Sequence, residues 1–259
     1  MKTLFAASML VVCASPALAG VVSGINGVNV RQRIFNDFPS SNLAVTNNFP
    51  AQVRFNEGPF GAADPDGGGF ANRHSAYFSN DGGSTAFDFN YEDGFDAQFK
   101  MSLSTDVRNG KEAGFHSDLF GFGFFGVLPN GEIAAFGSIF EFHSFGVVPG
   151  STSGDISLRM IYTPGNGDGT VGGAGTIRST FEYMYSLGGG WVSSGLKLIG
   201  NGEGGIPSAF PFFVGMGVQN SPQGATFSDT IFSNIVVVPA PGAAALLGVA
   251  GLVGLRRRR

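Results

Sequence analysis

Short runs in which apolar and polar residues alternate recur along the chain between residues 20 and 238. The clearest run covers residues 95–103, and similar runs cover residues 84–90, 156–162 and 176–185. Successive side chains of a β-strand point to opposite faces. The clearest run therefore has one apolar face and one polar face, formed by Phe95, Ala97, Phe99, Met101 and Leu103 against Asp96, Gln98, Lys100 and Ser102. One buried face and one solvated face are typical of an antiparallel sheet.

Clusters of turn-forming residues separate these runs. Residues 80–83, 129–132 and 164–169 contain the Gly, Asn, Asp and Pro residues that tolerate tight turns, whereas helical periodicity is scarce. This pattern predicts an all-β fold class, an antiparallel two-sheet jelly-roll sandwich formed by one large domain over residues 20–236. Residues 120–125 alternate Phe with Gly, which predicts a strand whose glycine side is covered closely by another layer.

Composition supports the same fold class. The 259 residues include 42 Gly without a collagen-like period, which indicates many turns, and 27 Phe, which supply large buried surfaces. The chain has 15 basic and 19 acidic residues; without Lys2 and the four terminal arginines, 15 − 5 = 10 basic residues remain and the body is near −9. An acidic body argues against nucleic acid as a partner.

The first 19 residues have the pattern of a secretory signal peptide. Lys2 precedes an apolar stretch, and Ala17 and Ala19 form the small-x-small site of a signal peptidase. We expect a signal helix that is removed after Ala19, together with Cys13, the only cysteine. The alternative is a buried N-terminal helix.

The last 23 residues, 237–259, combine a proline motif, an apolar segment and a basic end. The motif is Val238-Pro239-Ala240-Pro241, and Arg256, Arg257, Arg258 and Arg259 close the chain. A helix beginning at Pro241 has about 15 residues and spans ~22 Å, whereas a bilayer core needs ~30 Å. The segment is therefore a marginal membrane span with a basic stop behind it.

This three-part tail resembles the PEP-CTERM sorting signal, although the usual Glu of the motif is missing. The resemblance implies recognition by an exosortase-type membrane peptidase, transient membrane association through the tail, and export to the cell surface or extracellular matrix of a bacterium that makes exopolysaccharide. The alternative is a permanent single-span anchor, because a short helix can be accommodated in a bilayer.

The order of the segments in the body resembles a concanavalin A-like jelly roll of the lectin and glucanase type. The resemblance rests on Asn36-Asp37-Phe38, on the "EAGF" of residues 112–115 and on the closing segment at 225–238. This fold hosts both binding proteins and hydrolases, so it does not decide the function.

No catalytic constellation is recognisable. Retaining glycosidases need two carboxylates ~5–5.5 Å apart, often as E-x-D-x-x-E on a strand, and the nearest acidic cluster, Glu92 to Asp96, has the wrong order. The three histidines, His74, His116 and His143, lack the spacing of a zinc site. The G-x-S-x-G motif of serine hydrolases does not occur. We therefore expect no enzyme; a diverged glycoside hydrolase or lyase using Glu92, Asp96 or Glu112 is the alternative.

Two binding sites remain as candidates. Asp64 and Asp66 lie two residues apart in a glycine-rich loop, where hard oxygen ligands suit Ca²⁺. Trp191, with Tyr183 and Tyr185 upstream, could stack on a pyranose face. The chain is thus expected to be a non-catalytic exported protein in contact with extracellular polysaccharide, or alternatively a protein-binding adhesin.

Overall fold

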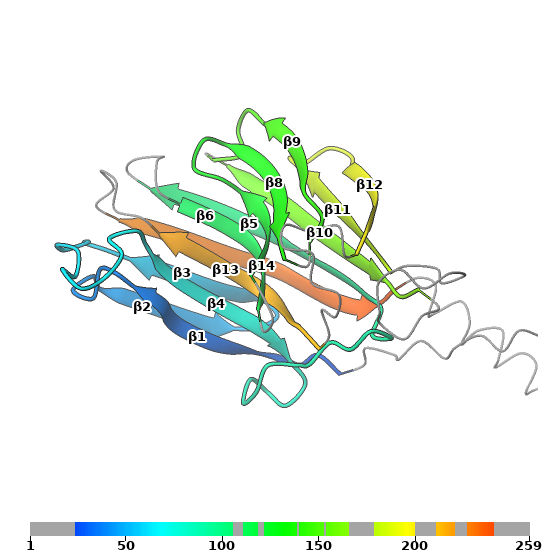
Figure 1. Ribbon diagram of the computed structural model, residues 1–259, viewed down its shortest axis with the longest axis horizontal. Helices are drawn as coiled ribbons and strands as arrows, with labels where there is room; N and C mark the ends of the chain where they lie inside the picture. The colour runs from blue at the N-terminus through cyan, green and yellow to red at the C-terminus, as the bar shows by residue number, and fades with distance from the viewer. Residues whose placement is uncertain are drawn as a thin grey trace, which may run out of the picture.

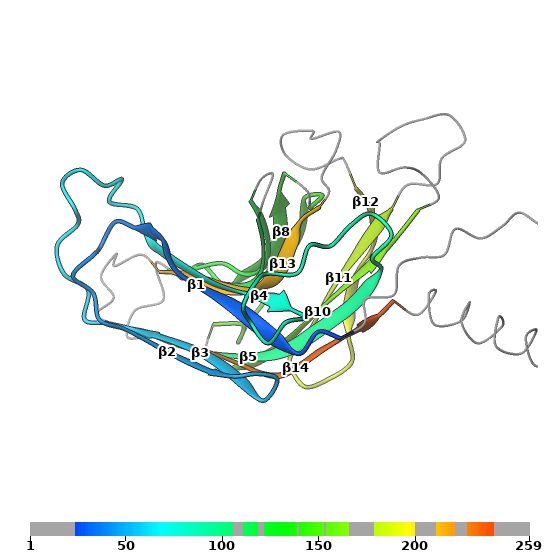
Figure 2. The same cartoon turned by 90° about the horizontal axis from the view of Figure 1, so that it is seen from below.

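Strands form every regular element in the described part of the structure. The computed structural model describes residues 24–105, 111–118, 122–138, 140–152, 154–165, 179–199, 211–220 and 227–240. Over these residues, two seven-stranded sheets pack face to face in two layers (Figures 1 and 2). The signal helix and the tail helix that the sequence predicts, and the residues 241–259, lie outside this described part.

The front sheet faces the viewer in Figure 1 and has the strand order β1-β4-β13-β6-β7-β8-β9. Its strands are β1 (Gly27–Asn36), β4 (Asn72–Ser79), β13 (Phe213–Asn220), β6 (Lys111–Asp118), β7 (Gly123–Val127), β8 (Glu132–Gly137) and β9 (His143–Val147).

The back sheet has the order β12-β11-β10-β5-β14-β3-β2. Its strands are β12 (Val192–Leu198), β11 (Thr180–Ser186), β10 (Asp155–Thr163), β5 (Phe95–Thr105), β14 (Ser228–Pro239), β3 (Gln52–Glu57) and β2 (Leu43–Asn48). All neighbouring pairs in both sheets are antiparallel. The fold is therefore the all-β jelly-roll sandwich that the sequence predicts.

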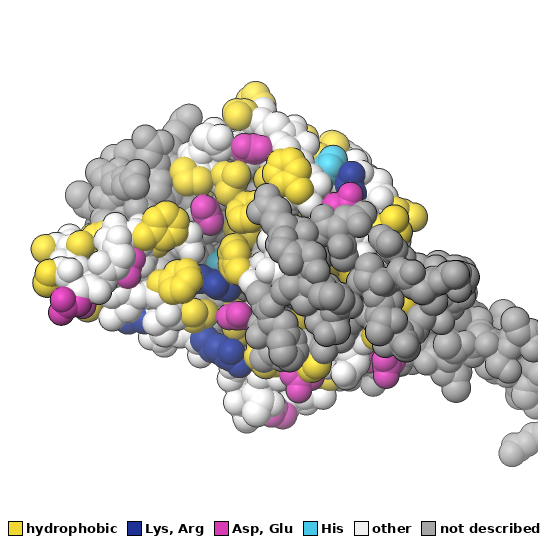
Figure 3. All heavy atoms as spheres, in the orientation of Figure 1, with side chains coloured by type: hydrophobic (Ala, Val, Ile, Leu, Met, Phe, Trp, Pro, Cys, Tyr) yellow, Lys and Arg dark blue, Asp and Glu magenta, His cyan; other side chains and the backbone are white. Residues whose placement is uncertain are grey.

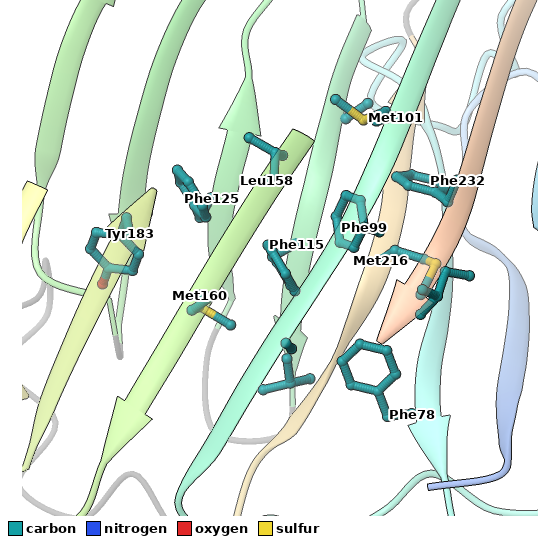
Figure 4. Packing of buried hydrophobic residues seen from close by; sticks show 14 of the residues in the cluster. Phe78, Phe99, Met101, Phe115, Phe125, Leu158, Met160, Tyr183, Met216 and Phe232 are labelled. Atoms are coloured by element: carbon teal, nitrogen blue, oxygen red, sulfur yellow. The ribbon is translucent and has the colours of Figure 1, made fainter. Parts of the chain in front are cut away.

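Aromatic side chains fill the space between the sheets. Phe99 of β5 lies with its ring centroid 4.4 Å from that of Phe115 of β6, which joins the two layers directly. Figure 4 shows how such residues from both sheets point toward one another: Phe78, Phe115, Phe125 and Met216 from the front sheet, and Phe99, Met101, Leu158, Met160, Tyr183 and Phe232 from the back sheet. Burial of these rings supplies the main favourable free energy of folding.

Most of the alternating runs are strands. The run at residues 95–103 lies in β5, with its apolar face in the core, and the run at 156–162 lies in β10. The prediction of a strand at residues 84–90 is wrong. This segment connects the two layers, and its only β-bridge joins Phe89 to Phe212. Phe89 of this segment is buried in the hydrophobic core, but the segment forms no ladder of strand hydrogen bonds. Of the run at 176–185, the residues from Thr180 onward lie in β11.

The Phe-Gly pattern at residues 120–125 is described from Phe122 onward, and close covering is seen there at Gly123. A Cβ atom at Gly123 of β7 would lie 3.3 Å from the ring of Phe140, so this position is closely covered. Phe124, on the other face of β7, pairs with Phe136 of β8 and tilts against it at a centroid distance of 5.1 Å.

The last strand runs further than the expected domain boundary at residue 236. Val237, Val238 and Pro239 pair with Ala97, Asp96 and Phe95 of β5. The backbone N–H of Ala240 donates to Gly94 O at 3.1 Å, and Ala240 is buried. The first part of the proline motif therefore belongs to the sandwich, because β5 is long enough to pair with it.

A buried polar network interrupts the apolar interior at one end. Glu57, at the end of β3, is fully buried, and its Oε2 accepts from Asn220 Nδ2 at 2.8 Å and from His74 Nε2 at 3.0 Å. His74 Nδ1 accepts the backbone N–H of Arg33, which leaves the imidazole proton on Nε2. The Oε1 of Glu57 accepts from Ser41 and Asn72. The carboxylate thus joins the back sheet to β4 and β13 of the front sheet.

These hydrogen bonds govern the ionisation of Glu57. Burial alone would raise the pKa of its carboxyl group, but hydrogen bonds from His74, Asn220 and Ser41 outweigh this effect and hold the pKa at about 2. The ordinary value is 4.5, so the folded state prefers the charged form.

We predict a stability loss in acid that depends on Glu57. A depressed folded-state pKa contributes stability that is complete above pH 4.5 and is lost as the pH falls toward about 2. The shift corresponds to about 3 kcal/mol. Urea unfolding between pH 7 and pH 2 measures it. Glu57→Gln should flatten this dependence, whereas Glu92→Gln, a change in an exposed loop, should keep it. Equal acid dependence in wild type and Glu57→Gln would contradict the assignment.

Candidate functional site

A small pocket of roughly 150 Å³ opens on the outer face of the back sheet. It is lined by Gln98, Phe99, Lys100, Ser157, Trp191 and Asn234. Gln98 and Lys100 come from the polar face of β5, and Ser157 comes from the neighbouring strand β10. The pocket therefore combines one large aromatic ring with amide, hydroxyl and ammonium groups.

Trp191 forms the apolar wall of this pocket. It lies just before β12 and is 38% exposed. The guanidinium carbon of Arg159 lies 6.0 Å from the centroid of its ring. Arg159 in turn donates from Nε to Asp96 Oδ1 at 2.8 Å and makes a second bond through Nη2, so it is held in a bidentate ion pair. The ring is thus positioned by an arginine that is itself fixed to β5.

Asn234 enters the pocket from an irregularity in β14. The pairing of β14 with β5 shifts between Ser233 and Val236, and Asn234 has a φ of 52°. Such bulges re-aim side chains, and left-handed backbone in a non-glycine residue is uncommon outside special sites. The bulge in β14 places Asn234, with its amide group, at the edge of the pocket.

Charged groups at the pocket are paired within the sheet. Lys100 Nζ lies 2.6 Å from Asp155 Oδ2. The hydrogen bond from Lys100 lowers the pKa of Asp155, so this carboxylate is ionised at neutral pH. The site therefore presents hydrogen-bonding groups of both kinds beside Trp191, with the charges of Lys100 and Arg159 balanced.

The structure separates the three aromatic residues that the sequence grouped together. Tyr183 is fully buried and Tyr185 packs against the core cluster, both on the inner face of β11. Only Trp191 lies on the outer face. Tyr183 therefore offers no surface to a ligand, because its ring contacts Phe125 at 5.1 Å and Phe140 at 5.8 Å between the layers.

The partners of Trp191 in the pocket cannot be predicted from the sequence. Gln98 and Lys100 lie on the polar face that the alternation predicts, but no local signal connects them to residue 191. Asn234 carried no signal either, because a bulge depends on how β14 pairs with β5.

One carboxylate of the predicted calcium loop, that of Asp64, bonds to the backbone. Asp64 Oδ1 accepts the N–H of Asp66 at 3.0 Å. Nearby, Asp37 Oδ2 accepts the N–H groups of Phe70 and Ala71, and these bonds lower its pKa. No group of three or more His, Cys, Asp or Glu side chains that could hold a metal occurs in the described ranges. The bond from Asp66 to Asp64 is that of a local turn, and calcium binding by this loop stays a prediction.

The structure does not bring together the carboxylates of the enzymatic alternative. Asp96 lies on the outer face of the back sheet in its ion pair with Arg159. Glu112 lies on the outer face of the front sheet, opposite Gln219 of β13, and Glu92 lies in a turn before β5. A two-carboxylate mechanism requires both groups beside one bond.

Two of the three histidines are fully buried. His74 belongs to the Glu57 network. His116 is fully buried beside Ser75, and burial holds its pKa well below the ordinary value. His143 packs edge-on against Phe145 at 4.5 Å, and its pKa is lowered mainly by burial.

Within the described ranges, no helix reaches the length and apolarity that a membrane crossing requires.

No protein-family model and no curated protein matches the chain. Among solved structures, a functionally unknown protein from Saccharomyces cerevisiae is 12% identical, with a TM-score of 0.45; the match covers 78% of this chain and 98% of that chain. A GH43 glycoside hydrolase, engineered to display both endo-xylanase and exo-arabinofuranosidase activity, is 13% identical, with a TM-score of 0.43. The match covers 86% of this chain and 41% of that chain.

The alginate lyase AlgAT5 from polysaccharide lyase family 7 is 11% identical, with a TM-score of 0.40; the match covers 77% of this chain and 82% of that chain. Similarity at this level leaves the function to be argued from the residues of the chain itself.

We predict that the bulge at Asn234 tolerates only residues that accept a left-handed backbone. Asn234→Val should lower the free energy of unfolding by about 1–2 kcal/mol, because a β-branched side chain is strained at a φ of 52°. Asn234→Gly should stay within about 0.5 kcal/mol of wild type. Urea denaturation of the three proteins compares them, and equal stability of the Val and Gly variants would refute the strain.

Proposed function

We propose that the protein is an exported, non-catalytic cell-surface or matrix protein that binds a saccharide in the Trp191 pocket. The observation that carries this proposal is the exposed face of Trp191 beside the amide, hydroxyl and ammonium groups of Gln98, Ser157 and Lys100. A sugar ring has an apolar face and a polar rim, and such a pocket complements both.

The shape of the pocket favours a small part of a larger glycan. A volume of roughly 150 Å³ is well below that of a site for a drug-sized ligand. It suits one sugar unit that stacks on Trp191 while the rest of the chain continues over the outer face of the back sheet. Binding is then weak for each unit and gains strength through repetition along a polymer.

Export is supported by the two ends of the sequence. The signal peptide at residues 1–19 and the three-part tail at residues 237–259 together fit a secreted protein that an exosortase-type peptidase processes. The pairing of β14 refines where the tail can be cut. Removal of Val237, Val238 and Pro239 would leave β5 with unpaired backbone groups, so we infer that processing falls after Ala240.

We predict that a matrix glycan protects Trp191 from solvent. It is the only tryptophan, so quenching of its fluorescence by acrylamide reports this pocket alone. Addition of the exopolysaccharide purified from the producing organism should reduce quenching. Trp191→Phe, which keeps a smaller ring, and Trp191→Ala should both weaken binding measured by calorimetry, the latter about tenfold.

Phe142→Ala provides the matched control, because Phe142 is also an exposed aromatic residue, at 56%, and lies outside the pocket. Equal binding of the glycan by wild type and Trp191→Ala would contradict the saccharide proposal. If no glycan binds, a protein-binding adhesin gains support, since the edge strand β12 exposes Val192, Leu196 and Leu198.

We predict a mature protein whose carboxyl end lies at or after Ala240. Intact-mass spectrometry of the protein released from the producing cells measures this end directly. Deletion of residues 256–259 should leave the protein unprocessed, because the arginines form the stop of the signal. A mature end before Val237 would contradict the role of β14 as the closing strand.

A further inference from the structure

Aromatic rings hold two arginines on the outer face of the front sheet, on the opposite side of the molecule from Trp191. The guanidinium carbon of Arg31 lies 4.7 Å from the ring centroid of Phe213 and 5.1 Å from that of Tyr77. The guanidinium carbon of Arg73 lies 4.2 Å from the ring centroid of Phe122. Figure 3 shows Lys or Arg side chains beside hydrophobic ones on this face, over β1, β4 and β13.

The strand register brings both guanidinium groups to one tyrosine. Arg31 of β1 pairs with Ser75 of β4, which lies between Arg73 and Tyr77 on the same face of that strand. Arg31 stacks against the ring of Tyr77, and Arg73 Nη2 lies 3.4 Å from the hydroxyl of Tyr77. The two positive charges therefore flank Tyr77 from two sides.

Hydrogen-bonding capacity is left over on both arginines. Arg31 uses Nε to reach Asn29 Oδ1 at 3.3 Å, and neither Nη atom has a hydrogen-bond partner among the described residues. Arg73 is only 3% exposed. Among the described residues its Nε has no hydrogen-bond partner, and its nearest carboxylate oxygen, of Asp118, is 3.8 Å from Nη2. A buried, incompletely paired guanidinium is costly, and such groups mark functional positions.

Two other arginines, Arg54 and Arg159, are bonded differently. Arg54 meets Asp229 through two bonds of 2.8 Å, and Arg159 makes the same kind of pair with Asp96. Stacking on an aromatic ring instead leaves the N–H edge of a guanidinium available to a planar oxyanion. Arg31 and Arg73 are thus preorganised as donors, and Arg73 has only a longer ion pair, of 3.8 Å, with Asp118.

The surroundings suit a sugar ring more than a bare ion. Phe35 pairs with Arg73 across β1 and β4 and is 45% exposed, so it offers an apolar surface beside the charges. Gln219 of β13 pairs with Arg73 on the other side, and its Nε2 donates to Glu112 Oε2 at 3.3 Å. Burial raises the pKa of Glu112, and the nearby positive charge of Arg73 opposes this effect.

We propose that Arg31 and Arg73 form a second binding site, for the carboxylate of an acidic saccharide unit such as a uronate. Arg31, which is half-buried, contacts the carboxylate with its Nη donors. Arg73 lies behind it and contributes its charge from a site shielded from water, where electrostatic attraction is stronger. Phe35 takes the apolar face of the ring. This site does not depend on the Trp191 pocket and goes beyond it.

The test compares a charged ligand with its neutral isostere. Calorimetry of the full mature protein in 50 mM NaCl uses tetragalacturonate, its methyl ester and inorganic sulfate as probes. Tetragalacturonate should bind, the methyl ester should bind at least tenfold more weakly, and 500 mM NaCl should weaken binding of the charged probe because exposed charges are screened.

Variants assign the binding to the two arginines. Arg31→Gln and Arg73→Gln should each lower the association constant for tetragalacturonate at least tenfold. Arg54→Gln is the matched control, because it removes a guanidinium from the outer face of the other sheet, and it should bind as wild type does. Since Arg73 is buried and its variant can fail to fold, Arg31→Gln alone decides in that case, with circular dichroism as the check on folding.

Three results would overturn the site: equal binding of tetragalacturonate and its methyl ester, equal binding by wild type and Arg31→Gln, or binding of sulfate without binding of tetragalacturonate. Trp191→Ala should leave the uronate titration unchanged. Loss of uronate binding in Trp191→Ala with retention in Arg31→Gln would instead place acidic sugars in the Trp191 pocket, so the two proposals fail separately.

Discussion

Packing of one aromatic face of each seven-stranded sheet against the other is the constraint on which the rest of the structure depends. Rings such as Phe99 and Phe115 meet across the interface, and each strand commits alternate residues to it. The same alternation sends the remaining residues outward on both sides. A sandwich of this kind therefore has two outer faces. The residues on these faces can differ in chemistry because they take no part in core packing.

The interior is not wholly apolar, and its exception shows how the layers are held in register at one end. Glu57 from the back sheet accepts hydrogen bonds from His74 and Asn220 of the front sheet, and Ser41 and Asn72 satisfy its other oxygen. A carboxylate with four donors is stable in the interior, whereas one with fewer would be expelled or protonated. Burial of the carboxylate has a desolvation cost, but its hydrogen bonds fix the relative placement of β3, β4 and β13.

The two outer faces differ in how their charges are treated. On the back sheet, Arg159, Lys100 and Arg54 are paired with carboxylates at short distances, and Trp191 provides the exposed apolar surface. On the front sheet, Arg31 and Arg73 are stacked on rings and keep unused donors. The first arrangement suits a neutral polyhydroxylated ligand, and the second suits an anionic one. If both proposed sites bind, the protein would link different sugars of one polymer.

The sequence by itself determined the fold class, because a two-residue period survives in β5 and β10 whatever their partners are. It also placed Gln98 and Lys100 of β5 on the outer face, although Asp96 on that same face is buried in its ion pair with Arg159. It could not show that residues 84–90, with the same period, lack a partner strand, nor that Val237 to Pro239 continue β14 along β5. Local spacing grouped Tyr183, Tyr185 and Trp191, yet only the tertiary structure decided that Trp191 faces outward beside Asn234, some forty positions away. The aromatic stacking of Arg31 and Arg73 and the burial of Glu57 were likewise decided by strand order and register, since both join side chains that no short stretch of sequence contains.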